Sequence, residues 1–289
     1  MHHVIFDLEW NQPADRSLMV EEPVYLTGEL IELGAVKLDG SFRIIDELKL
    51  YFKPIHYTRM HRRIATLTGI SDRTLAQEAL PFGEACGRVL DFCGEECTLM
   101  TWSMSDLPML VDGMLLHGMD VSRLPDWCDL QRIFGREIMR SDTRYSLDTA
   151  LGVLKEEGEK AHDAFHDSRN TAKVCGHLDL EDYLEEYGAK AFAPQDPAEH
   201  PPTAAALLQS REVTEFACPW CGAPVTCEPW IPWGGHTYGT LGVCEDGEEW
   251  FVWVETIRCR TDDFCAKRLV YDMSDDLWEL YQDRKSPAE

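Results

Sequence analysis

The chain has 289 residues, of which 44% are hydrophobic and 10% aromatic, and its formal net charge is −25. This is the composition of an ordinary folded protein, and no segment approaches the roughly 18 apolar residues of a membrane helix, so we expect no membrane-spanning helix. Residues 1–190 carry a balance of −14 and residues 191–289 one of −11. Neither half is therefore a basic module of the kind that coats nucleic acid.

The N-terminus and the cysteines indicate where the protein works. The first ten residues, MHHVIFDLEW, contain acidic residues and no basic segment of the kind that begins a secretory signal, so we expect a cytoplasmic protein. Of the 11 cysteines, five are scattered over the first 190 residues and six lie between Cys218 and Cys265. In a reducing compartment this pattern predicts thiols in the first part and metal ligands in the second.

Strands and helices alternate along the first 190 residues. The expected strands are His2–Glu9, Leu30–Leu38, Phe42–Phe52, Cys97–Trp102 and Trp127–Leu130. The expected helices are Pro81–Cys93, a segment after Ser105, a segment reaching Arg140, a helix capped by Ser146 that ends at Leu154, and a long helix from about Asp163 to Tyr187. Three strands followed by alternating helices and strands predict a mixed α/β sheet with flanking helices.

The chain divides into a large and a small domain. Residues 1–188 form the α/β domain in this prediction, and residues 189–212, rich in proline and alanine, form a linker. Residues 213–289 are rich in tryptophan and cysteine, which predicts a small β domain like a zinc ribbon with a C-terminal helix.

Carboxylates begin and end the α/β domain. Residues two apart in a strand point to the same side, so Asp7 and Glu9 project together, and they are costly to bury without a cation between them. Asp106 follows a strand, and His162 and Asp167 open the long helix. Taken singly, these three are also ordinary helix-end residues.

The segment His162–His166 imitates the His-Glu-x-x-His of zinc proteases, but its shorter Asp would misplace the base.

Together the five residues resemble the DEDDh exonucleases, which have an RNase H-like fold, over about residues 2–180. The resemblance implies that Asp7, Glu9, Asp106 and Asp167 bind two Mg²⁺ or Mn²⁺ ions, which oxygen ligands suit, and that His162 is the general base. It further implies hydrolysis of single-stranded nucleic acid from a free 3′ end, with release of nucleoside 5′-monophosphates.

The stretches FDLEWN at 6–11, ELGAV at 32–36 and LTGI at 67–70 resemble the branch that trims RNA in RNA-interference and histone-mRNA pathways, together with its bacterial relatives. RNA is accordingly favoured over DNA. The alternatives are a DNA-directed proofreading or repair exonuclease, and a non-catalytic scaffold that acts through the zinc ribbon.

Two basic clusters offset the acidic field. Arg59, Arg62 and Arg63 precede LTGI, close to where the resembled family holds its substrate, and we expect phosphate contacts from them. Arg132, Arg136 and Arg140 recur every four residues, which fits a solvated helix face at least as well.

The C-terminal cysteines predict one structural zinc ion. Cys218-Pro-Trp-Cys221-Gly is a tight turn that directs two thiolates toward one ion. We expect Cys259 and Cys265 to complete the site, with Cys227, Cys244 and His236 as competing ligands. The tryptophans of this module could stack nucleic-acid bases, but because the module is also acidic, a protein partner or core packing is the commoner explanation for them.

Overall fold

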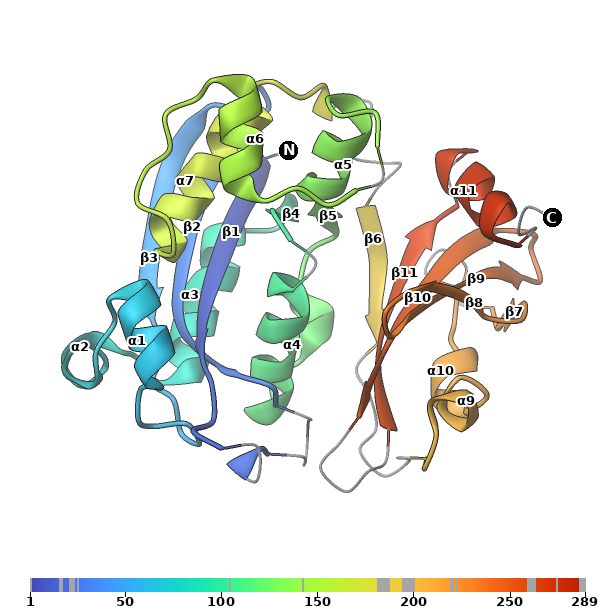
Figure 1. Ribbon diagram of the computed structural model, residues 1–289, viewed down its shortest axis with the longest axis horizontal. Coiled ribbons are helices and arrows are strands. Elements are labelled where there is room, and N and C mark those ends of the chain that lie inside the picture. The colour runs from blue at the N-terminus through green and yellow to red at the C-terminus, as the bar shows by residue number, and fades with distance from the viewer. Residues whose placement is uncertain are drawn as a thin grey trace. The chain divides into compact units, whose positions relative to one another are not determined.

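The computed structural model describes residues 2–15, 18–20, 24, 26–103, 105–141, 143–180, 188–193, 201–218, 221, 223–258, 264–273 and 275–285. The chain forms two compact units (Figure 1). The first comprises Met1–Val20 and Leu26–Tyr183, and the second comprises Glu21–Tyr25 and Leu184–Glu289.

The first unit is built on a five-stranded mixed sheet. Its strands are β1 (His2–Asn11), β2 (Glu29–Leu38), β3 (Ile44–Tyr51), β4 (Cys97–Thr101) and β5 (Trp127–Asp129). The spatial order is β3-β2-β1-β4-β5, in which β1 pairs antiparallel with β2 and parallel with β4. The first three strands form an antiparallel meander, and the mixed α/β fold is confirmed.

The helices of the first unit pack on this sheet. They are α1 (Arg62–Thr68), α2 (Asp72–Glu78), α3 (Phe82–Cys93), α4 (Asp106–Leu116), η2 (Val121–Arg123), α5 (Leu130–Glu137), α6 (Leu147–Leu154) and α7 (Ala164–Cys175). Helices α1 and α2 were not among the expected elements. Their apolar residues Ile64 and Leu75 are buried against Ile31 of β2, so tertiary packing stabilises two helices of only seven residues each.

Two expected helices are shorter in the structure. The helix expected over 163–187 ends at Cys175, where the N–H groups of Gly176 and His177 bond back to carbonyls of the last turn. Residues 181–187 of that expectation lie outside the described residues. Helix α5 ends at Glu137, and Arg140 follows it with a φ of 52°, so Arg132, Arg136 and Arg140 do not form one helical stripe.

Gly34 sets how closely α7 approaches the sheet. Helix α7 lies across β1 and β2 (Figure 1), and a Cβ atom at Gly34 would come within 2.1–2.2 Å of the backbone of Ala164 and Phe165. Only a residue without a side chain permits this contact. Because Gly34 is paired with Asp7 in the sheet, the start of α7 is held directly over that carboxylate.

The second unit is an antiparallel sheet with short helices. Its strands are β6 (Gly188–Ala193), β7 (Val225–Cys227), β8 (Ile231–Gly234), β9 (Thr237–Cys244), β10 (Glu249–Arg258) and β11 (Phe264–Asp272). Its helices are α9 (Ala204–Leu207), α10 (Arg211–Thr214) and α11 (Asp275–Lys285). The order is β6-β11-β10-β9-β7, with β8 also paired to β9.

The described part of the region expected as a linker, 189–212, is folded rather than extended. Its first residues form β6, which pairs with β11. Leu207, Leu208 and Val213 are buried against Val254 of β10 and Ala266 of β11. These apolar contacts make the described part of the segment a component of the second unit.

Within the described part of the chain, no helix has the length and apolar character that crossing a bilayer requires.

Candidate active site

Strand β1 presents two carboxylates on one side of the sheet. Asp7 pairs with Gly34 and Glu9 pairs with Glu32 on β2, and both Asp7 and Glu9 are partly buried. The apolar residues between and before them, including Phe6 and Leu8, are buried in the core. The alternation of β1 therefore fixes both carboxylates next to the start of α7, as the sequence predicts.

Helix α7 supplies the third carboxylate. Carboxylate oxygens of Asp7, Glu9 and Asp167 all lie within 4.8 Å of one another. The backbone N–H of His162 donates a hydrogen bond to Asp167 at 2.9 Å, and the side-chain amide of Asn170 lies at 3.5 Å from it. These bonds hold Asp167 in the first turn of the helix.

Asp106 joins this group from the segment that follows β4, the strand paired with β1 on the edge opposite β2. It begins α4, is only 4% exposed, and accepts a hydrogen bond from the hydroxyl of Ser103 at 3.0 Å. After burial, the negative charge of Asp106 is the largest influence on the pKa of Asp7. The fold thus gathers four carboxylates that the sequence separates by up to 160 residues.

The raised pKa values of these carboxyl groups show that burial and mutual repulsion disfavour their charged forms. Burial, followed by repulsion from Asp106, Asp167 and Glu9, raises the pKa of Asp7 well above its usual range. Burial and the neighbouring Glu32 raise the pKa of Glu9 to about 8. Burial raises the pKa of Asp106 to about 7, although Ser103 and the N–H of Leu8 stabilise its charged form. A bound cation would relieve this repulsion.

The candidate base is placed in the loop that leads into α7. His162 has a φ of 61°, a left-handed conformation, and its side chain is exposed. Its backbone is tied to Asp167, and its imidazole is close enough for its charge to lower the pKa of that carboxyl, against the larger effect of burial, which raises it. His162 is therefore beside the carboxylate group and open to solvent.

A partly buried ion network, which the sequence patterns did not indicate, supports the site. The ammonium of Lys49 on β3 lies 2.6 Å from Glu32 and 3.0 Å from Asp163, which caps the N-terminus of α7. Burial raises the pKa of Asp163, but the hydrogen bond and charge of Lys49 outweigh it and hold that pKa below its ordinary value. Glu32 belongs to the ELGAV stretch noted in the sequence, but no sequence spacing indicates that residues 32, 49 and 163 contact one another.

The basic cluster at 59–63 is anchored by the end of β1. Asn11 is fully buried, and its side-chain amide donates hydrogen bonds to the carbonyls of Tyr57 and Arg59, while its oxygen accepts from the N–H of His61. Arg59, Arg62 and Arg63 are all exposed on the segment that these bonds hold. The structure therefore connects this segment to the strand that carries Asp7 and Glu9.

The structure brings two of the four cysteines expected to bind zinc together with a third cysteine, Cys244. Cys218 and Cys221 lie together with Cys244, with all three sulfurs within 4.8 Å of one another. Cys259 lies outside the described residues, and Cys265 on β11 is paired with Ile257 on β10. Cys244 sits at the opposite end of the sheet, beside the start of β10, so the expected completion of the site by Cys265 does not fit this register.

The carboxylate group suits hard divalent cations. Asp7, Glu9 and Asp167 offer only oxygen ligands, which favour Mg²⁺ or Mn²⁺ over softer metals. A family model described as "Exonuclease", of the RNase T type, matches residues 4–175. The chain belongs to this exonuclease family. The matched range contains all five residues singled out in the sequence.

Solved structures agree with the exonuclease fold. The nuclease domain of 3′hExo, described as a DEDDh family member bound to rAMP, is 21% identical, with a TM-score of 0.52 over 63% of this chain and 92% of that one. Cell-death related nuclease 4 is 20% identical, with a TM-score of 0.51 over 61% and 62%. E. coli exonuclease I in complex with a dT13 oligonucleotide is 13% identical, with a TM-score of 0.53 over 83% and 55%. No curated protein matches the chain.

These comparisons confirm the predicted family, the RNase H-like fold and the enzyme class, which is a hydrolytic exonuclease. Membership of this family implies divalent metal ions in the active site. The zinc ribbon, the cytoplasmic location and a protein partner remain predictions.

Proposed function

We propose that this exonuclease removes nucleotides from the 3′ end of single-stranded nucleic acid, with RNA favoured, and releases nucleoside 5′-monophosphates. The observation that carries the proposal is the convergence of Asp7, Glu9 and Asp167 within 4.8 Å, with Asp106 beside them. Carboxylates at this spacing repel one another, and they are stable together when they share divalent cations.

In this proposal Asp7, Glu9 and Asp167 hold the first of two Mg²⁺ or Mn²⁺ ions, and Asp7 and Asp106 hold the second. The ions would supply positive charge to the oxygens of the scissile phosphate, and they suit in-line displacement. Asp167 is kept in place for this task by the N–H of His162. Glu9 and Asp7 are kept in place by β1 and its pairing with β2.

His162 acts as the general base. A neutral imidazole accepts a proton from the attacking water near neutral pH. The water oxygen bonds to phosphorus, the bond from phosphorus to the 3′ oxygen of the preceding nucleotide breaks, and that oxygen takes a proton from solvent. The exposed side chain of His162, next to Asp167, is consistent with contact to water.

An acidic protein must attract an anionic substrate locally. The net charge of −25 disfavours phosphate binding over most of the surface. The exposed Arg59, Arg62 and Arg63, anchored to β1 through Asn11, provide positive charge near the end of the strand that carries the carboxylates. We assign them to the phosphates of the bound strand.

The preference for RNA is supported by the 3′hExo structure, which is described as bound to rAMP. A DNA-directed exonuclease is the second candidate, and a specific observation favours it. The exonuclease I structures, described with dT13 and dA16, match over 83% of this chain, whereas the 3′hExo domain matches over 63%.

The test incubates the full chain and Mn²⁺ with 5′-labelled single-stranded RNA and DNA of one sequence. We expect stepwise shortening from the 3′ end, faster on RNA, and a block by a 3′-phosphate. Asp7→Ala should abolish cleavage, whereas the matched control Asp91→Ala, at an exposed position of α3, should not change it. Cleavage of a circular strand, or full activity of Asp7→Ala, would refute the proposal. Faster cleavage of DNA would establish the second candidate.

A further inference from the structure

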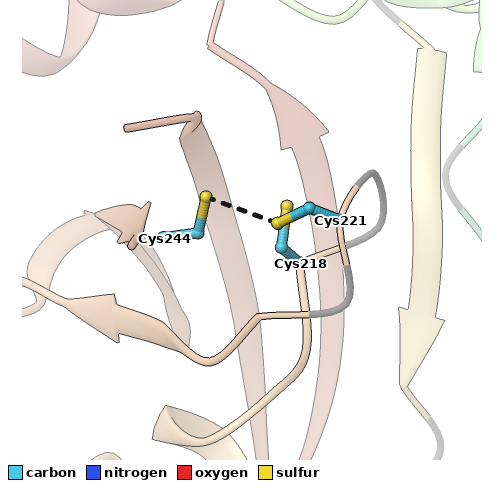
Figure 2. Close-up of side chains that lie close together, drawn as sticks. All are labelled: Cys218, Cys221 and Cys244. Atoms are coloured by element: carbon cyan, nitrogen blue, oxygen red, sulfur yellow. Dashed lines mark hydrogen bonds between the residues drawn. The ribbon is translucent and has the colours of Figure 1, made fainter. Parts of the chain in front are cut away.

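Three cysteines from two separate segments of the second unit converge on one point. Cys218 and Cys221 lie in the turn between α10 and β7, and Cys244 is the last residue of β9 (Figure 2). The three sulfur atoms lie within 4.8 Å of one another. Cys218 and Cys244 are buried, with 2% and 5% exposed, and Cys221 is exposed.

The spacing of the sulfurs matches a metal centre. Zn–S bonds of about 2.3 Å in a tetrahedron place the sulfurs about 3.8 Å apart. The sulfurs of Cys221 and Cys244 are 3.9 Å apart. A disulfide would require a separation of about 2.05 Å, so the arrangement is far from a covalent pair.

Two tight turns hold the thiols in this position. The N–H of Cys218 bonds to the carbonyl of Ala223 at 2.7 Å, which closes the first turn. The N–H of Cys244 bonds to the carbonyl of Glu248 at 3.1 Å, and Gly247 adopts a φ of 89°, which closes the second. Backbone bonds therefore set both turns, so the thiols are positioned before an ion binds.

The second turn brings a carboxylate into contact with Cys221. Asp246 follows Cys244 by two residues, and its side chain is hydrogen-bonded to the thiol of Cys221. A carboxylate oxygen is an accepted zinc ligand alongside thiolates. Asp246 is thus a carboxylate in contact with one of the three thiols, and its oxygens lie outside the group in which all donor atoms are within 4.8 Å of one another.

The register of β10 separates the other candidate ligands from this point. Val243, the neighbour of Cys244 in β9, pairs with Glu249, whereas Cys265 pairs with Ile257, eight residues further along β10, or roughly 26 Å in a strand. His236 is also at the far end, because its carbonyl accepts from the N–H of Thr256. The sulfur of Cys227 contacts the carbonyl of Thr214 at 3.8 Å instead.

We propose that Cys218, Cys221 and Cys244 bind a structural zinc ion, and that Asp246, which is hydrogen-bonded to Cys221, turns toward the ion to complete its coordination. Three soft sulfur donors and one oxygen donor favour zinc over the hard cations of the carboxylate site. The ion joins the 218–223 turn to the β9–β10 turn at the edge of a small core that contains Val225 and Trp250. Its main effect is to stabilise a sheet whose buried core is limited.

The test measures the zinc content of the full chain after dialysis against excess Mg²⁺. Wild type should retain about one zinc per chain. Cys244→Ser should lose most of it, and the matched control Cys227→Ser, in the same unit but outside the sulfur group, should keep it. Asp246→Asn should retain zinc with a weaker affinity. In Co²⁺-substituted protein, each Cys→Ser change within the site should lower the sulfur-to-cobalt charge-transfer absorption.

A measurement on the wild-type protein tests the site even if the variants fail to fold. In the presence of zinc, alkylation followed by peptide mass spectrometry should spare Cys218, Cys221 and Cys244, and removal of zinc should expose Cys221 first, because it is the exposed thiol. Full zinc content in Cys244→Ser, or loss of zinc in a Cys259→Ser or Cys265→Ser protein, would overturn this ligand set. Equal alkylation of Cys221 with and without zinc would overturn the site.

Discussion

Gly34→Ala should impair catalysis without removing any catalytic side chain. The added methyl group would lie 2.1–2.2 Å from backbone atoms of Ala164 and Phe165, where ordinary contacts begin near 3.4 Å. The start of α7 must then retreat by more than about 1 Å, and Asp167 and His162 retreat with it. A misplacement of about 1 Å at an active site costs on the order of 100-fold in rate.

The assay compares turnover of a short single-stranded oligonucleotide with thermal stability. Overpacking of this kind destabilises a protein by about 1–3 kcal/mol, so a control with a milder backbone clash away from the site is needed. A Cβ at Gly135 would meet the carbonyl oxygen of Ser141 at 2.9 Å, and one at Gly87 would meet no atom within 4 Å. We expect Gly135→Ala to lose stability but keep turnover in its folded fraction, and Gly87→Ala to resemble wild type.

The expected result is that only Gly34→Ala combines a folded protein with a turnover lower by about 100-fold, together with weaker activation by Mn²⁺. Turnover within a few-fold of wild type in a folded Gly34→Ala protein would show that the approach of α7 does not position Asp167. Equal losses of turnover in Gly135→Ala would show that general destabilisation explains the effect.

Three further predictions follow from the site. Lys49→Met removes the cation between Glu32 and Asp163, so it should lower turnover by roughly tenfold at unchanged substrate affinity. Lys49→Arg should restore turnover, and a loss that Arg does not restore would contradict a positioning role. Changing Arg59, Arg62 and Arg63 together to Ala should weaken binding of a single strand and reduce its salt dependence by about 0.7 in slope per lost phosphate contact, and an unchanged slope would return these residues to the solvated surface. In the metal-free protein, Glu9 binds its proton more tightly in the folded state than in the unfolded state, so its contribution to stability is full below about pH 4.5 and is lost as the pH rises to about 8. The melting temperature should therefore fall over this pH range, and Glu9→Gln should reduce that fall. An equal fall in the Glu9→Gln protein would refute the assignment.

Local patterns in the sequence determined the main elements and the catalytic candidates. The alternation of β1 is enough to place Asp7 and Glu9 on one side of a strand, and Ser146 begins α6 as a cap residue should. The order of Asp7, Glu9, Asp106, His162 and Asp167 predicted the family, since these residues occupy recognisable positions within or next to their elements.

Long-range contacts decided what the sequence could not. The bridge of Lys49 to Glu32 and Asp163 joins three distant segments, and the close approach at Gly34 depends on how α7 packs. In the second unit, the regular Cys218-x2-Cys221 turn was recognisable, but its partner was not. Cys244 does not belong to a Cys-x2-Cys pair in the sequence. The antiparallel pairing of β7 with β9, in which Val225 lies opposite Cys244, brings it to that segment, and the registers of β9, β10 and β11 leave Cys265 at the other end of the sheet. Sequence spacing encodes local geometry, whereas the pairing of strands determines which distant ligands meet.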